Sequence, residues 1–161
     1  MQNWIKSACI FSRYRLILIM KEGFKDMEIR KATEKDLIHI IRSLQNKGID
    51  YNTTKQAKED LRLNRLFVAV DNEKIIGSCA VVPEEKYGYT AIKRLCVYNK
   101  KNCGKGIASQ LVKYICALDY ERLGATPWDN PPVIKLLERN GFKYQYTFLE
   151  KYNFYLRESL S

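Results

Sequence analysis

Long apolar runs are missing from this 161-residue sequence. The longest run near its start, Leu16 to Met20, has five residues, far short of the roughly 20 that a membrane span needs. It is also shorter than the apolar core of a signal peptide, which has about 7 to 15 residues. No Ser-, Gly- or Pro-rich linker and no internal repeat divides the chain. The sequence therefore indicates one compact domain with no membrane partner, long enough to bury a substantial core.

Cysteine pairs and histidine are equally scarce. The cysteines, Cys9, Cys79, Cys96, Cys103 and Cys116, are an odd number, none of them forms a CxxC pair, and the chain has one histidine. A disulfide framework and a zinc site both need regularly spaced ligand pairs. We therefore expect no metal site, and a reducing, cytoplasmic compartment.

Acidic residues are fewer than basic ones, 18 against 28, and the formal net charge is +10. Clustered Lys and Arg would indicate phosphate binding, either to nucleic acid or to a phosphate-bearing cofactor. Residues 1 to 26 carry five basic and two acidic residues, or +3, and the remaining chain carries 23 and 16, or +7. The charge is thus spread along the chain, and no nucleic-acid recognition motif accompanies it. We therefore do not expect a nucleic-acid partner.

The first 26 residues have neither helical nor alternating apolar periodicity. From Met27 the sequence reads at once as a strand followed by a capped helix. The codons for Lys-Glu-Gly, just before Met27, would be purine-rich like a ribosome-binding site. We expect residues 27–161 to form the single domain, and residues 1–26 to be either an artefact of the assigned start codon or a disordered arm.

Periodicity then predicts an α+β domain with a mostly antiparallel sheet. Thr33 is a good helix N-cap, and the apolar positions after it repeat at helical spacing. Asn130 is a second expected N-cap, and the two prolines after it suit a first helical turn. The expected order is strand 28–33, helices 34–47 and 53–64, strands 66–72, 74–84 and 89–99 with a turn at Asp71-Asn72, helix 104 to about 124, strand 125–129, helix 131–139, and strands 142–148 and 150–158.

A basic glycine loop joins the third of the central strands to a helix. Such loops bind phosphates because backbone N–H groups and the helix dipole face the anion there. A Walker A loop would have a glycine at position 99 and a Ser or Thr at position 106, where this chain has Asn99 and Gly106, so that motif is excluded. A dinucleotide fingerprint needs a third glycine where Ser109 stands, and it belongs after a first parallel strand. Taken alone, the loop is compatible with a simple tight turn.

With its surroundings, the loop resembles that of the GNAT superfamily of acetyl-CoA-dependent N-acetyltransferases. The family's R/Q-x-x-G-x-G/A is matched by Lys101, Gly104 and Gly106, with Lys in place of Arg or Gln. The order of elements over nearly all of residues 27–158 also resembles the family fold. A second family element, N-x-x-A-x-x-L-Y-x-x-x-G-F, aligns with Asn130, Val133, Leu136, Leu137, Gly141 and Phe142.

The resemblance implies a binding site for acetyl-CoA. The loop and the start of the next helix would bind the coenzyme A pyrophosphate, and the preceding strand would pair with the pantetheine arm. The Val97 amide would donate to the thioester oxygen during acyl transfer. Asn130 would contact the pantetheine side while capping its helix. The implied cofactor-binding residues are Leu95, Cys96, Val97, Lys101, Asn102, Cys103, Gly104, Lys105, Gly106, Ile107, Ala108 and Asn130.

Proton transfer is where the sequence departs from the family. The family's usual tyrosine acid aligns with Leu137, and its frequent glutamate base aligns with Ala91. An alkylammonium acceptor must lose a proton before it attacks, because its pKa is about 10.4. The remaining candidates are Glu84, Glu85 and Asp129, each through a water molecule or simply as a solvated charge, and Tyr144, Tyr146 and Tyr98, each also explained by strand packing.

The implied activity is transfer of an acetyl group from acetyl-CoA to a primary amine of a small molecule or peptide, by direct attack in a ternary complex. The alternative is an acyl-CoA-binding regulatory or interaction domain that lacks turnover, which the residues Ala91 and Leu137 would permit. Either a monomer or a homodimer is compatible with the sequence, since the final strands can leave an exposed edge.

Overall fold

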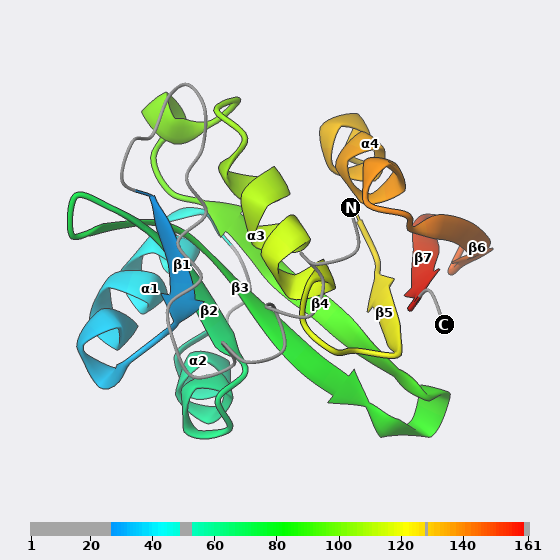
Figure 1. Cartoon of the computed structure of the whole chain (residues 1–161), viewed down its shortest axis with the longest axis horizontal. Coiled ribbons are helices and arrows are strands. Elements are labelled where there is room, and N and C mark those ends of the chain that lie inside the picture. The colour runs from blue at the N-terminus through cyan, green and yellow to red at the C-terminus, as the bar shows by residue number, and fades with distance from the viewer. Residues whose placement is uncertain (1–26, 49–52, 128, 160–161) are drawn as a thin grey trace, which may run out of the picture.

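The computed structural model describes residues 27–48, 53–127 and 129–159, so the first 26 residues, and the expectation about them, lie outside it. Helices and strands follow one another in the order that the sequence predicts (Figure 1). The strands are β1 (Glu28–Lys31), β2 (Leu66–Asp71), β3 (Lys74–Glu84), β4 (Tyr89–Val97), β5 (Arg122–Ala125), β6 (Lys143–Phe148) and β7 (Tyr152–Glu158), and the helices are α1 (Glu34–Asn46), α2 (Thr53–Arg62), α3 (Ile107–Cys116) and α4 (Pro131–Arg139).

All the described strands form one sheet of seven, in the order β1-β2-β3-β4-β5-β7-β6. Neighbouring strands are antiparallel except β4 and β5, which are parallel. The parallel pair needs a crossover, and α3 supplies it. The predicted α+β class with a mostly antiparallel sheet is confirmed.

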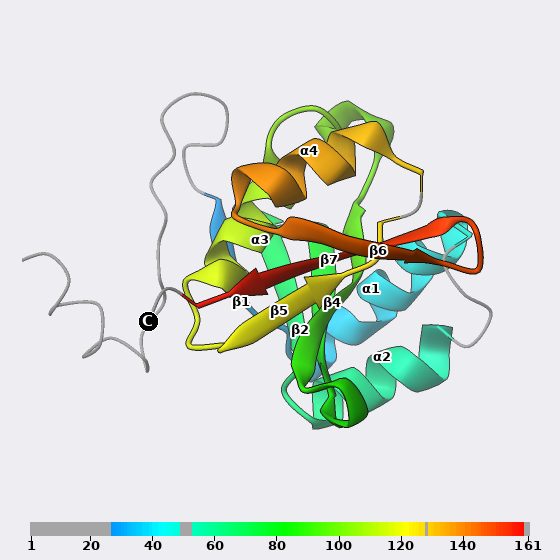
Figure 2. The ribbon, with the colours of Figure 1, turned by 90° about the vertical axis from the view of Figure 1, so that its right-hand side faces the viewer.

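Helices cover both faces of the sheet (Figure 2). One apolar core lies between the sheet and α3, with Leu111 and Ile115 fully buried, and Leu137 of α4 joins this core. A second, smaller core lies on the opposite face, where Ile40 and Leu44 of α1 pack on the alternate residues of β2. A side chain of the central strands therefore faces either α3 and α4 or α1 and α2.

Helix α1 begins where the sequence predicts, because Thr33 and Asp36 form a capping box. The Thr33 amide donates to Asp36 Oδ2 over 2.7 Å, and Arg30 of β1 donates to the same carboxylate over 2.7 Å. Burial alone would raise the pKa of Asp36, but these hydrogen bonds outweigh it and bring the pKa to about 2. The carboxylate thus joins the start of α1 to the first strand. None of the described helices is long and apolar enough to cross a membrane.

The expected helix over 104–124 and strand over 125–129 are wrong in their bounds. Helix α3 ends at Cys116, and the next strand is Arg122–Ala125. The apolar residue Leu123 suits a helical stripe, but it is buried in the sheet, where β5 pairs with β7. Pro127 follows β5 and has no N–H for a ladder, so the strand forms on the N-terminal side of it. The first hairpin turn is also one residue later than expected, at Asn72-Glu73, where both residues have positive φ.

Candidate functional site

A bulge in β4 determines the geometry of the centre of the sheet. Ser78 pairs with Cys96 and Ala80 with Lys93, so Cys79 alone faces both Arg94 and Leu95. Arg94 has φ +51°, a left-handed conformation that costs a residue with a side chain of order 1 kcal/mol or more. Such a bulge bends its strand and increases the local twist.

Beyond the bulge, β4 separates from β5. The two strands pair only at Thr90 with Leu123 and Ala91 with Gly124. Figure 1 shows them adjacent near the β3–β4 hairpin and apart towards α4. The Tyr98 amide donates to Ile76 of β3 over 2.8 Å. Because successive backbone groups alternate in direction along a strand, the Val97 amide points to the other edge, where no described strand pairs with it.

A cleft of about 900 Å³ opens between the diverging strands. Its lining includes Val133 and Leu137 of α4 and also Gly48, which follows α1 on the opposite side of the sheet. The cleft therefore reaches both layers of helices. Its other lining residues are Glu84, Tyr89, Ala91, Ile92, Lys93, Arg94, Leu95, Gly124, Ala125, Thr126, Pro127, Asn130 and Phe154.

The glycine loop follows β4 directly. A 3₁₀ turn at Lys100–Asn102 begins it, and the buried Asn102 side chain donates to the Tyr98 carbonyl over 3.0 Å. Gly104 and Gly106 have φ +76° and +81°, and a Cβ on either would meet no atom within 4 Å. The glycines are thus required by backbone conformation and not by crowding.

Helix α3 begins immediately after this loop. Its first internal hydrogen bond is donated by Gln110 to Gly106. The three amides before Gln110 have no carbonyl partner within the helix, and Gly106 has no side chain to cap them. The loop and the start of α3 therefore present backbone donors with the positive end of the helix dipole.

The predicted cofactor residues divide into three groups. Leu95 and Asn130 line the cleft, and Asn130 Oδ1 also accepts from the Val133 amide over 3.4 Å, which confirms it as the N-cap of α4. Cys96 faces the opposite core, with α1. The other predicted cofactor residues lie outside the lining of the cleft, in the segment from the end of β4 to the first turn of α3. They are Val97, Lys101, Asn102, Cys103, Gly104, Lys105, Gly106, Ile107 and Ala108.

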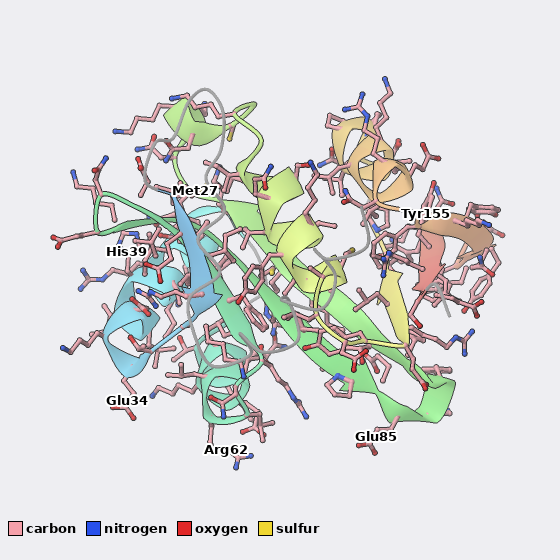
Figure 3. All side chains as sticks on the ribbon, viewed as in Figure 1. Met27, Glu34, His39, Arg62, Glu85 and Tyr155 are labelled. Atoms are coloured by element: carbon pink, nitrogen blue, oxygen red, sulfur yellow. The ribbon has the colours of Figure 1, made fainter. Side chains whose placement is uncertain are left out.

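Only one of the predicted acid and base candidates lines the cleft. Glu84 lies there and forms an ion pair with Lys93, whose ammonium donates to its carboxylate. Glu85 is exposed at the tip of the β3–β4 hairpin and points away from the sheet (Figure 3). Asp129 is exposed just before α4 and is not part of the lining.

The tyrosine candidates also lie outside the cleft lining. Tyr144 and Tyr146 are about half exposed on β6, and the Tyr144 hydroxyl bonds to Thr147 Oγ1 over 2.9 Å. Tyr98 is buried with its hydroxyl bonded to Ser78, and burial raises its pKa. The tyrosine that does line the cleft is Tyr89, which the sequence reasoning missed.

Tyr89 and Arg94 line the cleft without having been expected there, and only Tyr89 has a signal in the sequence that could have placed it. Tyr89 precedes Ala91 by two residues, so strand alternation places both on one face. Burial and the nearby Glu84 raise the pKa of its hydroxyl. The Arg94 guanidinium forms a buried ion pair with Asp60 of α2 and donates to Gln56 Oε1 over 3.0 Å. No periodicity predicts that bulge, so Arg94 reads as an ordinary strand residue.

The described residues contain no group of three or more His, Cys, Asp and Glu side chains arranged to hold a metal ion. In solved structures, the fold is similar to that of a GNAT-family acetyltransferase from Bacillus cereus ATCC 10987, with a TM-score of 0.69 and 17% identity over 84% of this chain and 99% of the other. It is similar to ribosomal-protein-alanine N-acetyltransferase from Brucella melitensis, with a TM-score of 0.68 and 17% identity over 81% and 99%.

A third similar structure is that of N-acetylglutamate synthase from Neisseria gonorrhoeae in complex with coenzyme A and N-acetyl-glutamate. The TM-score is 0.63, with 18% identity over 86% of this chain and 36% of that one. No curated protein is similar enough in sequence to count as a relative. A family model for the acetyltransferase (GNAT) domain matches residues 62–144, which include the bulged strand and the glycine loop. The chain belongs to the GNAT acetyltransferase family.

Proposed function

We propose that this protein transfers an acetyl group from acetyl-CoA to a primary amine by direct attack in a ternary complex. The observation that carries the proposal is the divergence of β4 from β5 at the bulge, directly before the glycine loop. A thioester substrate would find an unpaired strand edge there and an anion-binding loop at its end. The acceptor amine would belong to a small molecule or a peptide.

The described residues fit coenzyme A in size and chemistry. A cleft of about 900 Å³ is within the range of small-molecule sites. The amides from Gly104 to the first turn of α3 would hold the pyrophosphate, with Lys101 and Lys105 adding positive charge. Leu95 and Val97 would pair with the amide groups of the pantetheine arm, and the Val97 N–H would polarise the thioester carbonyl. The similar synthase from Neisseria gonorrhoeae was solved with coenzyme A bound.

The acceptor would enter from the face of the sheet opposite to the one that coenzyme A occupies. The cleft reaches Val133 and Leu137 of α4 on one face and Gly48, after α1, on the other. If coenzyme A occupies the face with the glycine loop, the face with Gly48, Glu84 and Tyr89 is left for the amine. Approach from two faces would let both substrates be present together, which direct attack requires.

Glu84 is the residue that we assign to the acceptor ammonium. It is the one predicted carboxylate in the cleft lining, and its side chain is 27% exposed. Its ion pair with Lys93 fixes the carboxylate in place, so one oxygen can accept from the ammonium or from a water that carries its proton away. Glu85 and Asp129 lie outside the lining and are proposed only as solvated charges.

Release of free coenzyme A thiol from acetyl-CoA in the presence of amines tests the proposal. We expect Glu84→Gln to lower kcat about 100-fold, the lower end of general acid–base effects, with acetyl-CoA affinity unchanged. Glu85→Gln, the neighbouring residue outside the cleft, is the matched control and should keep wild-type kcat. Equal rates in the two variants would remove Glu84 from the mechanism.

An acyl-CoA-binding regulatory domain is the second candidate. The observation that favours it is that Ala91 and Leu137, the positions of the family's base and acid, both line the cleft and carry no proton-transfer group. This candidate predicts binding of acetyl-CoA without thiol release for any amine. Turnover above the uncatalysed rate with one acceptor would exclude it.

A further inference from the structure

A chain of aromatic contacts leads from the cleft to the edge of the sheet. We call it the aromatic stripe, and it starts at Tyr87 in the β3–β4 hairpin. Each ring centroid lies near the next: Tyr87 to Tyr89 at 6.3 Å, Tyr89 to Phe154 at 5.0 Å, Phe154 to Tyr146 at 5.3 Å, Tyr146 to Phe148 at 6.4 Å, and Phe148 to Tyr152 at 5.3 Å. These separations are typical of interacting aromatic pairs.

The stripe is continuous with the cleft because Tyr89 and Phe154 belong to both. Gly124 of β5 has no side chain and so leaves room for both of these rings. A Cβ at Gly124 would lie 2.5 Å from Tyr89 Cδ2 and 2.9 Å from Phe154 Cε2. The two rings therefore lie directly against the β5 backbone, at the last place where β5 pairs with β4.

The rings that flank these two are exposed. Tyr87 is 61% exposed and Tyr146 is 54% exposed, and every residue of β6 is exposed at the edge of the sheet. Packing inside the domain therefore does not account for Tyr146, although its ring contacts a buried ring, that of Phe154, in a tilted arrangement. An exposed aromatic surface that continues into a substrate cleft is a place for an apolar part of the substrate.

Charge on the stripe is close to balanced. Its hairpin segment carries Glu84 and Glu85 against Lys86 and Lys93, and β6 with the turn after it carries Glu150 against Lys143 and Lys151. Two of the lysines lie over rings of the stripe, Lys86 over Tyr87 at 5.5 Å and Lys151 over Tyr152 at 4.9 Å. A polyanion would need an excess of positive charge along this surface. The charge of the stripe therefore favours a ligand with a neutral aromatic ring over a nucleic acid.

We propose that the acceptor is a small amine that carries an aromatic ring. Its ring stacks against Tyr146 and the edge of Phe154, and its amine reaches into the cleft towards Glu84. This inference rests on the proposed acetyl transfer and narrows its acceptor. Stacking on one aromatic side chain is worth enough to change affinity about tenfold.

The test compares two tyrosines of the same strand in the full-length protein. Tyr144 and Tyr146 have nearly equal exposure, 53% and 54%, but Tyr144 contacts Tyr155 of the core and Tyr146 contacts Phe154 of the cleft. The acceptor probes are 2-phenylethylamine and ethanolamine. We expect wild-type kcat/KM for 2-phenylethylamine to exceed that for ethanolamine at least tenfold.

Tyr146→Ala should raise the KM for 2-phenylethylamine about tenfold with little change in kcat, and Tyr146→Phe should restore it. Tyr144→Ala should leave it unchanged, and neither variant should alter acetyl-CoA affinity. Equal use of both amines, equal effects of the two alanine variants, or a strong preference for a peptide N-terminus would overturn the aromatic acceptor while leaving acetyl transfer intact. Absence of acetyl-CoA binding by the wild type would overturn the proposed function and this inference with it.

Discussion

Removal of one partner of the ion pair between Arg94 and Asp60 should be one of the most destabilising single changes outside the apolar cores. The Arg94 side chain is 13% exposed and that of Asp60 is 6% exposed, so both charges have left water. Removing one partner of a buried pair costs about 3 to 5 kcal/mol, because the other charge remains buried and unpaired. Gln56 also accepts from Arg94, which places our expectation for Asp60→Ala near the lower end, at about 3 kcal/mol.

The backbone of Arg94 adds a second, separable effect. Its φ of +51° suits glycine, so Arg94→Gly should lose the ion pair but relieve strain, whereas Arg94→Ala should lose the pair and keep the strain. We expect Arg94→Ala to be less stable than Arg94→Gly by about 1 kcal/mol. The double variant with Asp60→Ala should be less destabilised than the sum of the single variants.

Urea unfolding monitored by circular dichroism measures these free energies. The control is Glu59→Ala, which breaks the exposed pair of Glu59 with Arg62 on the same helix and should leave the unfolding midpoint unchanged. Figure 3 shows Arg62 at the lower surface of the molecule. Strictly additive effects, or a loss below about 1 kcal/mol for Asp60→Ala, would refute the view that this pair anchors the bulge to α2.

Two further predictions concern pH and the shape of the cleft. The folded-state pKa of Asp36 is about 2 and its ordinary value is 3.8, so the ionised carboxylate should stabilise the fold by about 2 kcal/mol above about pH 5, and this stabilisation should be lost as the pH falls towards 2. Asp36→Asn should flatten this part of a plot of unfolding free energy against pH, and an unchanged slope would contradict the assignment. Gly124→Ala should displace the Tyr89 and Phe154 rings and raise the KM for the acceptor more than the Kd for acetyl-CoA, measured by steady-state kinetics and titration; equal effects on both would show that these rings do not border the acceptor.

Local signals in the sequence predicted the order of the elements well. Thr33 and Asn130 are N-caps in the structure, and helices α1 and α4, which follow them, lie close to their expected bounds. Each of these signals depends on residues only a few positions apart. Such signals survive folding because tertiary contacts only reinforce them.

The wrong predictions occur where contacts between residues far apart in the sequence determine the local structure. Leu123 and Gly124 read as the end of a helix, but pairing with β7 makes them a strand. At the bulge, Arg94 pairs with Asp60 and Gln56, which lie on α2 more than thirty positions earlier, and no periodicity contains that information. The same holds for the cleft, since Tyr89 and Phe154 meet only across Gly124.

The central claim is that the loop between β4 and α3 binds coenzyme A. Isothermal titration of the full-length protein with acetyl-CoA tests it directly, with the double variant Gly104→Glu and Gly106→Glu and, as a control, Gly88→Glu, which changes a left-handed glycine in the distant hairpin. We predict micromolar binding by the wild type and by the control, and no binding by the folded double variant, because two carboxylates would repel the pyrophosphate. A folded wild-type protein that does not bind acetyl-CoA, or a double variant that binds as well as the control, would contradict the account.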